Sequence, residues 1–281
     1  MTFQVPSDRV GVCSWSLRPT LCDDLIASVR ACGVRLVQLH LDPVRTLQWR
    51  ADHVGDRFRN EGIVIASGMM GMKDEDYSTL ESIKATGGIR PDATWDANLR
   101  AAEGNAILAA RLGIDLVTFH AGFLPHEAGN PERGTMIGRL TAIAEIFGGR
   151  RIRVALETGQ EHAPTLLGVL DEVNARVPSH ARVGVNFDPA NMILYGMGDP
   201  VEAASLLAPH IMQVHVKDAS PSDSLGEWGT EMPVGRGSVR WDAFLSTLAR
   251  CGYEGRFIIE REAGESRVDD VVAARRLLTG A

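Results

Sequence analysis

The sequence predicts an α/β fold, a (β/α)8 TIM barrel, as a single domain over residues 1–281. Eight short apolar runs alternate along the chain with longer segments of helical periodicity. The runs are apolar almost throughout, as expected of parallel strands that are covered on both faces. Eight strand–helix units in 281 residues fit a barrel of this kind, which needs roughly 250 residues. The alternative is a doubly wound sheet, but no glycine-rich phosphate-binding motif follows the first strand.

The expected strands follow one another at residues 10–14, 36–40, 63–67, 116–120, 153–157, 183–187, 211–215 and 257–260. The amphipathic stretches between them, expected to be helices, include residues 23–31, 94–112, 135–147, 164–177, 200–207 and 241–251. Glycine favours the left-handed backbone just past a helix end, and it precedes several strands at Gly33, Gly62, Gly113 and Gly252. The long connections 68–93 and 219–240 each follow a strand, so we expect them on the carboxyl-terminal face, where barrel active sites lie.

The composition excludes several classes of partner. A formal charge of −7 provides no basic surface for nucleic acid, whose binding requires Lys and Arg to neutralise phosphates. The first residues, MTFQVPSDRV, lack the basic and apolar regions of a signal peptide. No apolar run approaches the roughly 20 residues of a membrane helix. The four cysteines show no CxxC spacing, so we expect reduced thiols in a cytoplasmic protein.

Polar residues stand at the ends of four consecutive predicted strands: Glu157, Asp188, His215 and Glu260. Taken singly, each fits an ion-paired or solvated strand end. Together they would place three carboxylates and one imidazole at one face, where the carboxylates would repel one another without a cation. One divalent ion would neutralise this repulsion. A donor set of three oxygens and one nitrogen suits Mn²⁺ or Mg²⁺ better than a thiolate-seeking metal. The pattern therefore favours a metal site.

Four further residues are candidates for substrate binding, each with a structural alternative. Trp15 could carry a sugar or pack at the barrel mouth, and His120 could bind hydroxyl groups or only fill a polar corner. Lys217 could donate to substrate or pair with Asp218. Arg236 lies in a glycine-flanked segment and could reach an anionic or hydroxyl-rich substrate, although exposed loop arginines are commoner.

The chain resembles the xylose-isomerase-like TIM barrels of the sugar phosphate isomerase/epimerase superfamily, which includes tagatose 3-epimerase, hydroxypyruvate isomerase, inosose dehydratase and endonuclease IV. The resemblance covers nearly the whole chain and depends on the motifs LETG, FDPAN, HVKD, VGRGSVRW and IIERE. It implies that Glu157, Asp188, His215 and Glu260 bind one divalent metal. It also implies that Glu157 and Glu260 carry out acid–base chemistry in an isomerase or epimerase.

The chain departs from these relatives at two positions. Asn191 stands three residues after the metal aspartate, where the epimerases carry a histidine. Asn191 is a substrate-binding candidate, but its contacts with a substrate would differ from those of the epimerase histidine. Endonuclease IV needs additional histidines for its metal cluster, whereas this chain has Met69 and Asn191. With the acidic net charge, this difference predicts no three-metal site and no nuclease activity on abasic DNA.

The expected function is that of a divalent-metal-dependent isomerase or epimerase of a small carbohydrate. A metal bound to adjacent oxygens of a hydroxy-ketone acidifies the intervening C–H and stabilises an enediolate. One carboxylate then removes the proton and a second group returns it. Two alternatives stay open: a lyase or dehydratase acting on a keto-polyol or oxidised glycoside, and a non-catalytic sugar-binding barrel. Mn²⁺ is the expected ion, with Mg²⁺, Co²⁺ and Zn²⁺ as alternatives, and a homo-oligomer is left open.

Overall fold

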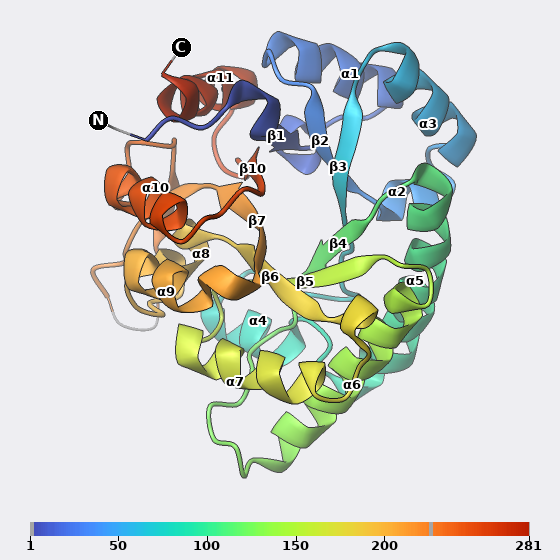
Figure 1. Cartoon of the computed structure of the whole chain (residues 1–281), viewed down its shortest axis with the longest axis vertical. Coiled ribbons are helices and arrows are strands. Elements are labelled where there is room, and N and C mark those ends of the chain that lie inside the picture. The colour runs from blue at the N-terminus through green and yellow to red at the C-terminus, as the bar shows by residue number, and fades with distance from the viewer. Residues whose placement is uncertain (1–2, 225–226, 281) are drawn as a thin grey trace.

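The structure, a computed structural model, describes residues 3–224 and 227–280. Eight parallel strands form a closed barrel in the order β1–β10–β7–β6–β5–β4–β3–β2, with helices around its outside (Figure 1). The barrel strands are β1 (Val10–Cys13), β2 (Leu36–His40), β3 (Val64–Met69), β4 (Leu116–Phe119), β5 (Arg153–Glu157), β6 (Val183–Phe187), β7 (Ile211–Val216) and β10 (Arg256–Ile259). The predicted (β/α)8 fold is confirmed.

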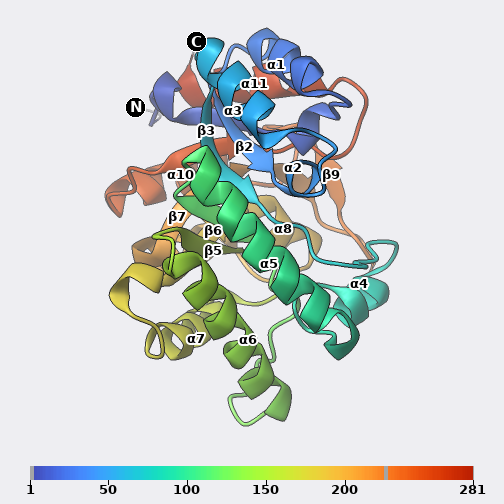
Figure 2. The same cartoon turned by 90° about the vertical axis from the view of Figure 1, so that its right-hand side faces the viewer.

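The helices are α1 (Cys22–Ala31), α2 (Asp42–Arg45), α3 (Ala51–Asn60), α4 (Leu80–Thr86), α5 (Asp92–Leu112), α6 (Pro131–Gly148), α7 (Ala163–Asn174), α8 (Pro189–Leu194), α9 (Pro200–Leu207), α10 (Trp241–Arg250) and α11 (Arg267–Thr279). Figure 2 shows the long helix α5 lying across the outside of the barrel, in contact with α3 and α6. The two ends of the chain meet, because the Val5 backbone N–H donates to the Leu278 carbonyl at 2.9 Å. None of the described helices has the length and apolar character needed to span a membrane.

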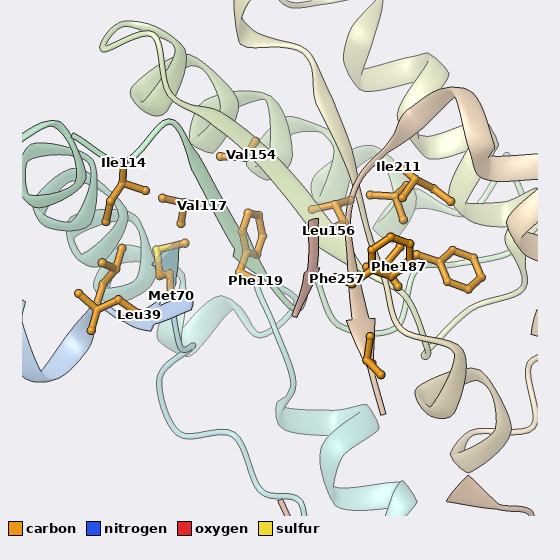
Figure 3. Packing of buried hydrophobic residues seen from close by; sticks show 14 of the residues in the cluster. Leu39, Met70, Ile114, Val117, Phe119, Val154, Leu156, Phe187, Ile211 and Phe257 are labelled. Atoms are coloured by element: carbon orange, nitrogen blue, oxygen red, sulfur yellow. The ribbon is translucent and has the colours of Figure 1, made fainter. Parts of the chain in front are cut away.

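Apolar side chains fill the space between the barrel and its helices. Strands β1, β4, β5 and β6 are buried along nearly their whole length, as the continuous apolar runs predict. Figure 3 shows part of this core, where Phe119, Leu156, Phe187 and Phe257 lie close together with Val117 and Val154. Helix and strand faces that would be unstable alone are thereby removed from water.

The boundaries differ from the prediction in places. The third strand begins at Val64 and continues to Met69, two residues beyond the expected end, because Met69 still pairs with His40 and Thr118 on both sides. The segment 219–240 is not simply a loop. Strand β8 (Asp218–Ser220) pairs antiparallel with β9 (Thr230–Met232) in a ribbon outside the barrel. Such a short ribbon has no apolar periodicity from which it could be predicted.

Asp218 holds this ribbon in place and does not line the rim with Lys217. Its carboxylate is fully buried and accepts hydrogen bonds from the backbone N–H groups of Ala219, Gly235 and Val239 and from the indole N–H of Trp241, at 2.8–3.1 Å. The Lys217–Asp218 ion pair, one of the two alternatives for Lys217, does not form, because these donors already satisfy the Asp218 carboxylate.

We expect Asp218→Ala to lower the free energy of unfolding by about 3 kcal/mol, because several buried N–H donors lose a charged acceptor. Urea unfolding of the variant and wild type measures this difference. Asp223→Ala, an exposed aspartate in the same segment, is the control and should stay within about 0.5 kcal/mol of wild type. Equal stability of Asp218→Ala and wild type would contradict the anchoring role.

Candidate metal centre and active site

Four side chains from neighbouring strands converge at the carboxyl-terminal end of the barrel. Glu157 ends β5, Asp188 follows β6, His215 lies in β7 and Glu260 follows β10. One ligand atom from each residue lies within 4.8 Å of those of the other three, and all four residues are buried. These residues, called the four-residue cluster below, are the predicted metal ligands, and the barrel order β5–β6–β7–β10 brings them together.

Two polar atoms at the centre of the four-residue cluster have no hydrogen-bond partner among the described residues. They are Nδ1 of His215 and Oδ2 of Asp188. His215 Nδ1 lies 3.3 Å from Glu157 Oε1, 3.3 Å from Glu260 Oε2 and 3.9 Å from Asp188 Oδ2. Buried polar atoms rarely lack a partner, since each such atom loses its hydration without compensation. Three carboxylates and one imidazole with these unpaired atoms facing one another fit a divalent cation.

Asp188 is positioned by the start of α8. Its Oδ1 caps the helix by accepting hydrogen bonds from the backbone N–H groups of Ala190 and Asn191, at 2.8 and 3.0 Å. Capping fixes the side chain, because an aspartate at this position satisfies otherwise unpaired N–H groups. The other oxygen, Oδ2, is therefore held toward the centre of the four-residue cluster.

Gln38 sets the orientation of the His215 ring. Its Oε1 lies 2.6 Å from His215 Nε2, while its Nε2 donates to Thr118 Oγ1 and to the Gly68 carbonyl. These contacts identify the amide oxygen, and at 2.6 Å it is a closer partner of Nε2 than the Asn186 amide nitrogen at 3.0 Å, so we assign a ring proton to Nε2. Burial opposes charge on the ring, but Glu157 and Glu260 outweigh that effect and raise the pKa of His215 well above its usual value, so that Nδ1 carries a proton toward the carboxylates. A bound cation would take the place of that proton, with Nε2–H held by Gln38, which is the arrangement that metal-binding histidines adopt.

A buried network of polar side chains continues below His215 inside the barrel. Gln213 Nε2 donates to Gln38 Oε1 at 3.0 Å and to Asn186 Oδ1 at 3.1 Å, and Ser67 Oγ donates to Gln213 Oε1 at 2.6 Å. The strand register shifts just before Gln38 and just before Asn186, as often occurs beside functional sites. The sequence analysis did not identify these residues, although each is a polar residue inside an otherwise apolar run.

Lys217 lies next to the four-residue cluster with its ammonium group buried. Its Nζ lies 3.1 Å from Glu260 Oε2, 2.5 Å from Glu262 Oε2 and 4.0 Å from Asp188 Oδ2. Burial opposes its charge, but these carboxylates outweigh that effect and raise the pKa of Lys217 well above its usual value. Lys217 thus offsets one of the three negative charges of the four-residue cluster. The two remaining negative charges equal the charge of a divalent cation. The charge of Glu262 is not counted here, because its side chain is half exposed and solvated.

The carboxylates of the four-residue cluster differ in their protonation. Burial raises the pKa of Asp188 well above its usual value, and Glu260 and Glu157 add to this effect against the opposing influence of Lys217. Burial also acts on Glu157, but His120 and His215 lower its pKa below the usual value. Lys217 and His215 likewise overcome burial and lower the pKa of Glu260. The two glutamates are therefore held in their ionised form, which a general base needs, whereas the Asp188 carboxyl favours its protonated form.

Four of the five predicted substrate-binding residues touch the four-residue cluster. The Trp15 indole N–H donates to Glu260 Oε1 at 2.8 Å, so the ring is fixed beside this carboxylate. His120 Nε2 lies 3.4 Å from Glu157 Oε1, and Asn191 Nδ2 donates to the same oxygen at 3.0 Å. Lys217 Nζ donates to Asn191 Oδ1 at 3.3 Å.

Arg236 is not part of this arrangement. It is exposed in the segment between β9 and α10, and no hydrogen bond or ion pair of the described residues joins its side chain to the four-residue cluster. Its role in substrate binding stays a prediction.

A cavity of considerable size lies elsewhere on the barrel, away from the four-residue cluster. A cavity of about 700 Å³ lies at the opposite end of the barrel, where Leu116, Val183 and Ile211 begin their strands. Its lining contains none of the four-residue cluster. The carboxyl-terminal end carries the converging charged groups, so the chemistry identifies the site there.

Comparisons with known proteins agree with this geometry. The family model described as "Xylose isomerase-like TIM barrel" matches residues 26–279. The chain belongs to this family. A xylose isomerase domain protein from Planctomyces limnophilus is 30% identical, with a TM-score of 0.87, and the match covers 98% of this chain and 97% of that chain. Comparison with curated proteins gave no match.

Two more distant structures show the same fold. The probable 3-DHS dehydratase AsbF from Bacillus anthracis is 20% identical over 96% of this chain and 98% of that chain, with a TM-score of 0.74. An L-ribulose 3-epimerase is 16% identical over 96% of this chain and 93% of that chain, with a TM-score of 0.73. Enzymes of different reaction types thus share this barrel, so the fold alone does not select the reaction.

Glu161, in the segment between β5 and α7, is a buried carboxyl group that the sequence analysis missed. No hydrogen bond or ion pair of the described residues reaches its side chain, and burial raises its pKa to about 8. In the unfolded chain the same carboxyl group has its usual pKa of about 4.5. The protein therefore loses stability as the pH rises from about 4.5 to about 8, since ionisation then favours the unfolded state.

We expect Glu161→Gln to remove this pH dependence and to stabilise the protein by up to about 3 kcal/mol at pH 7, but hardly at all at pH 4.5. Thermal unfolding of both proteins across this range measures the difference. Glu127→Gln, at an exposed position, is the control. A stability difference between variant and wild type that does not change with pH would contradict the assignment.

Proposed function

We propose that this protein is a divalent-metal-dependent isomerase or epimerase of a small carbohydrate. The observation that carries the proposal is the pair of unpaired buried atoms, His215 Nδ1 and Asp188 Oδ2, facing the carboxylates of Glu157 and Glu260. The four residues of the cluster would hold the ion, and their oxygen-rich donor set favours Mn²⁺, with Mg²⁺, Co²⁺ or Zn²⁺ as alternatives. Such an ion, when bound, polarises adjacent oxygens of a hydroxy-ketone and makes the intervening C–H more acidic.

Glu157 and Glu260 are the proposed acid–base pair. They come from β5 and β10, which β6 and β7 separate in the barrel, so they can approach a bound sugar from different sides. Neutral donors hold both: Asn191 Nδ2 and Asn186 Nδ2 donate to Oε1 and Oε2 of Glu157, and Trp15 Nε1 donates to Glu260 Oε1. One glutamate removes the proton from the substrate carbon and the other returns it.

Lys217 orients Glu260 and connects it with solvent. It donates to Glu260 Oε2 and also to Glu262 Oε2, which is half exposed. The ammonium group can also donate to a hydroxyl or keto oxygen of the substrate, where a fixed donor stabilises developing negative charge. His120 Nε2 lies 3.4 Å from Glu157 Oε1, so that it can act on Glu157 as Lys217 acts on Glu260.

A lyase is the second candidate, and Asn191 is the observation that favours it. Its amide contacts both Glu157 and Lys217 but cannot exchange protons as the histidine of the epimerases can. Loss of hydroxide or of a glycosidic group needs one proton removed and a leaving group protonated, which Glu157, Glu260 and Lys217 could perform.

Incubation of metal-loaded protein with a panel of keto-sugars in deuterated water separates these functions. Deuterium in the recovered sugar supports the isomerase or epimerase. A product that has lost the mass of water or of a glycosidic group supports the lyase. Tight binding with neither change would make the protein a non-catalytic sugar-binding barrel.

The wild-type protein is expected to bind one divalent ion per chain after reconstitution with Mn²⁺, and Asp188→Ala to bind it at least about tenfold more weakly. Elemental analysis and calorimetry give the stoichiometry and affinity. Asp223→Ala, at an exposed position, should bind as wild type does. If the wild type takes up no divalent ion even on reconstitution, the proposed metal site is wrong.

Metal-saturated Glu260→Gln should exchange the substrate proton with solvent at least about 100-fold more slowly than wild type, because it keeps an oxygen ligand but loses the basic charge. Deuterium wash-in measured by NMR, with metal content checked in the same sample, gives the rate. Glu262→Gln is the matched control, since Glu262 also touches Lys217, and it should stay within about tenfold of wild type. Exchange at the wild-type rate in Glu260→Gln would leave Glu260 as a ligand only.

A further inference from the structure

A group of aromatic side chains lies next to the four-residue cluster. Tyr195 follows the last residue of α8, and its backbone N–H donates to the Asn191 carbonyl at 2.9 Å. Residues four apart share one side of a helix, so Tyr195 lies about 5–6 Å beyond Asn191 on the same side. Asn191 itself contacts Glu157 and Lys217. The Tyr195 side chain therefore starts one helical turn beyond the residue that contacts Glu157 and Lys217.

The segment after β5 packs closely against Asn191 and Tyr195. A Cβ atom on Gly159 would lie 2.5 Å from Asn191 Cβ and 3.3 Å from Tyr195 Cδ2, so only glycine allows the backbone to approach both residues. The φ angle of +146° at Gly159 also requires glycine. The approach brings the next residue, Gln160, to Tyr195.

Two other aromatic rings surround Tyr195, each from a different part of the chain. Phe123, after β4, lies with its ring centre 5.7 Å from that of Tyr195 at an angle of 78°. Trp228, between β8 and β9, lies 4.8 Å away at 62°. Edge-to-face rings of this kind present flat apolar surfaces at different angles. Such surfaces suit the C–H faces of a sugar ring.

Two buried polar atoms beside Tyr195 lack partners among the described residues. Gln160 Nε2 lies 3.2 Å from the Tyr195 hydroxyl, but Gln160 Oε1 has no partner, although the residue is only 3% exposed. The indole N–H of Trp228 is also buried and unpaired. One atom is an acceptor and the other a donor. Leaving both unpaired is unfavourable, so they indicate a ligand that carries donors and acceptors together. Sugar hydroxyl groups both donate and accept hydrogen bonds.

We propose that Phe123, Gln160, Tyr195 and Trp228 form a subsite for a second ring, so that the substrate is a keto-sugar in glycosidic linkage and not a free monosaccharide. The inference rests on the proposed function, since the four-residue cluster would hold the reacting ring. Gln160, Tyr195, Phe123 and Trp228 are uncharged at neutral pH, so the second ring is expected to be neutral. Lys84 approaches Phe123, with Nζ 5.9 Å from the ring centre, and makes a phosphorylated sugar the alternative to be tested.

The decisive comparison tests several keto-sugars with the metal-loaded full-length protein. Each keto-sugar is supplied in three forms: free, as its O-glucoside and as its phosphate. We expect kcat/KM for the O-glucoside to exceed that for the free sugar at least about tenfold, since the second ring adds binding contacts. Trp228→Phe keeps the ring but removes the N–H, and should raise KM for the glucoside about tenfold with little change in kcat. The same variant should leave both constants unchanged for the free sugar.

The control is Trp95→Phe, because Trp95 lies on α5 against Arg139. It should change neither substrate's constants, and thermal unfolding checks that both variants are folded. Free sugars or sugar phosphates used better than glucosides would overturn the proposal. An equal effect of Trp228→Phe on free and glycosidic substrates would also overturn it, since that result indicates a general structural role.

A binding measurement keeps this proposal separate from the proposed catalytic function. Saturation-transfer NMR with unoxidised glucosides, which carry no keto group to react, reports binding of the second ring alone. Binding to wild type and to Glu260→Gln, with at least about tenfold weaker binding to Trp228→Phe, would support the subsite even if no keto-sugar exchanged its proton. The catalytic proposal would then fail by itself. If no glucoside binds to the wild type, the subsite is wrong whether or not free keto-sugars react.

Discussion

The hydrogen bond between Gln38 and His215 is the contact on which the site depends. It lies inside the barrel, where a polar group without a partner costs more than in water. The Gln38 amide is held in place because its Nε2 donates to the Gly68 carbonyl and to Thr118 Oγ1, while its Oε1, which contacts His215, also accepts from Gln213 Nε2. The ring therefore has one stable orientation, with Nδ1 toward the carboxylates. In a purely apolar barrel interior nothing would fix this orientation, and Nδ1 would not be held toward the carboxylates.

Electrostatics adds a second constraint. Glu157, Asp188 and Glu260 are buried close together, and burying charge without compensation is strongly unfavourable. Lys217 supplies part of the compensation from within the chain. The neighbouring Asp218 points to the other side of the strand and binds backbone N–H groups of the segment that leads to α10. Two adjacent charged residues thus serve opposite faces, because successive side chains of an extended strand alternate. One belongs to the site and the other to the scaffold that holds the strand end.

The barrel and the ligand set follow from local features of the sequence. Continuous apolar runs indicate strands buried on both faces, and a polar residue at the end of each run then lies at one end of the barrel. His215 and Glu260 were predictable for this reason. The antiparallel ribbon formed by β8 and β9 was not, because three-residue strands are too short to show a period. Gln38 and Gln213 left a visible signal, a polar residue within an apolar run, but its meaning depends on which strands are neighbours.

The sequence by itself determined the eight strand–helix units, the metal-ligand candidates and the acidic net charge. These properties depend on residue type and spacing within short segments. Only the tertiary structure decided that Lys217 pairs with Glu260 and not with Asp218, and that Arg236 lies apart from the four-residue cluster. It also decided that Gln160, Tyr195 and Trp228 meet. Those contacts join residues far apart in the chain, and their distances follow from closure of the barrel and packing of its loops, which no local pattern encodes.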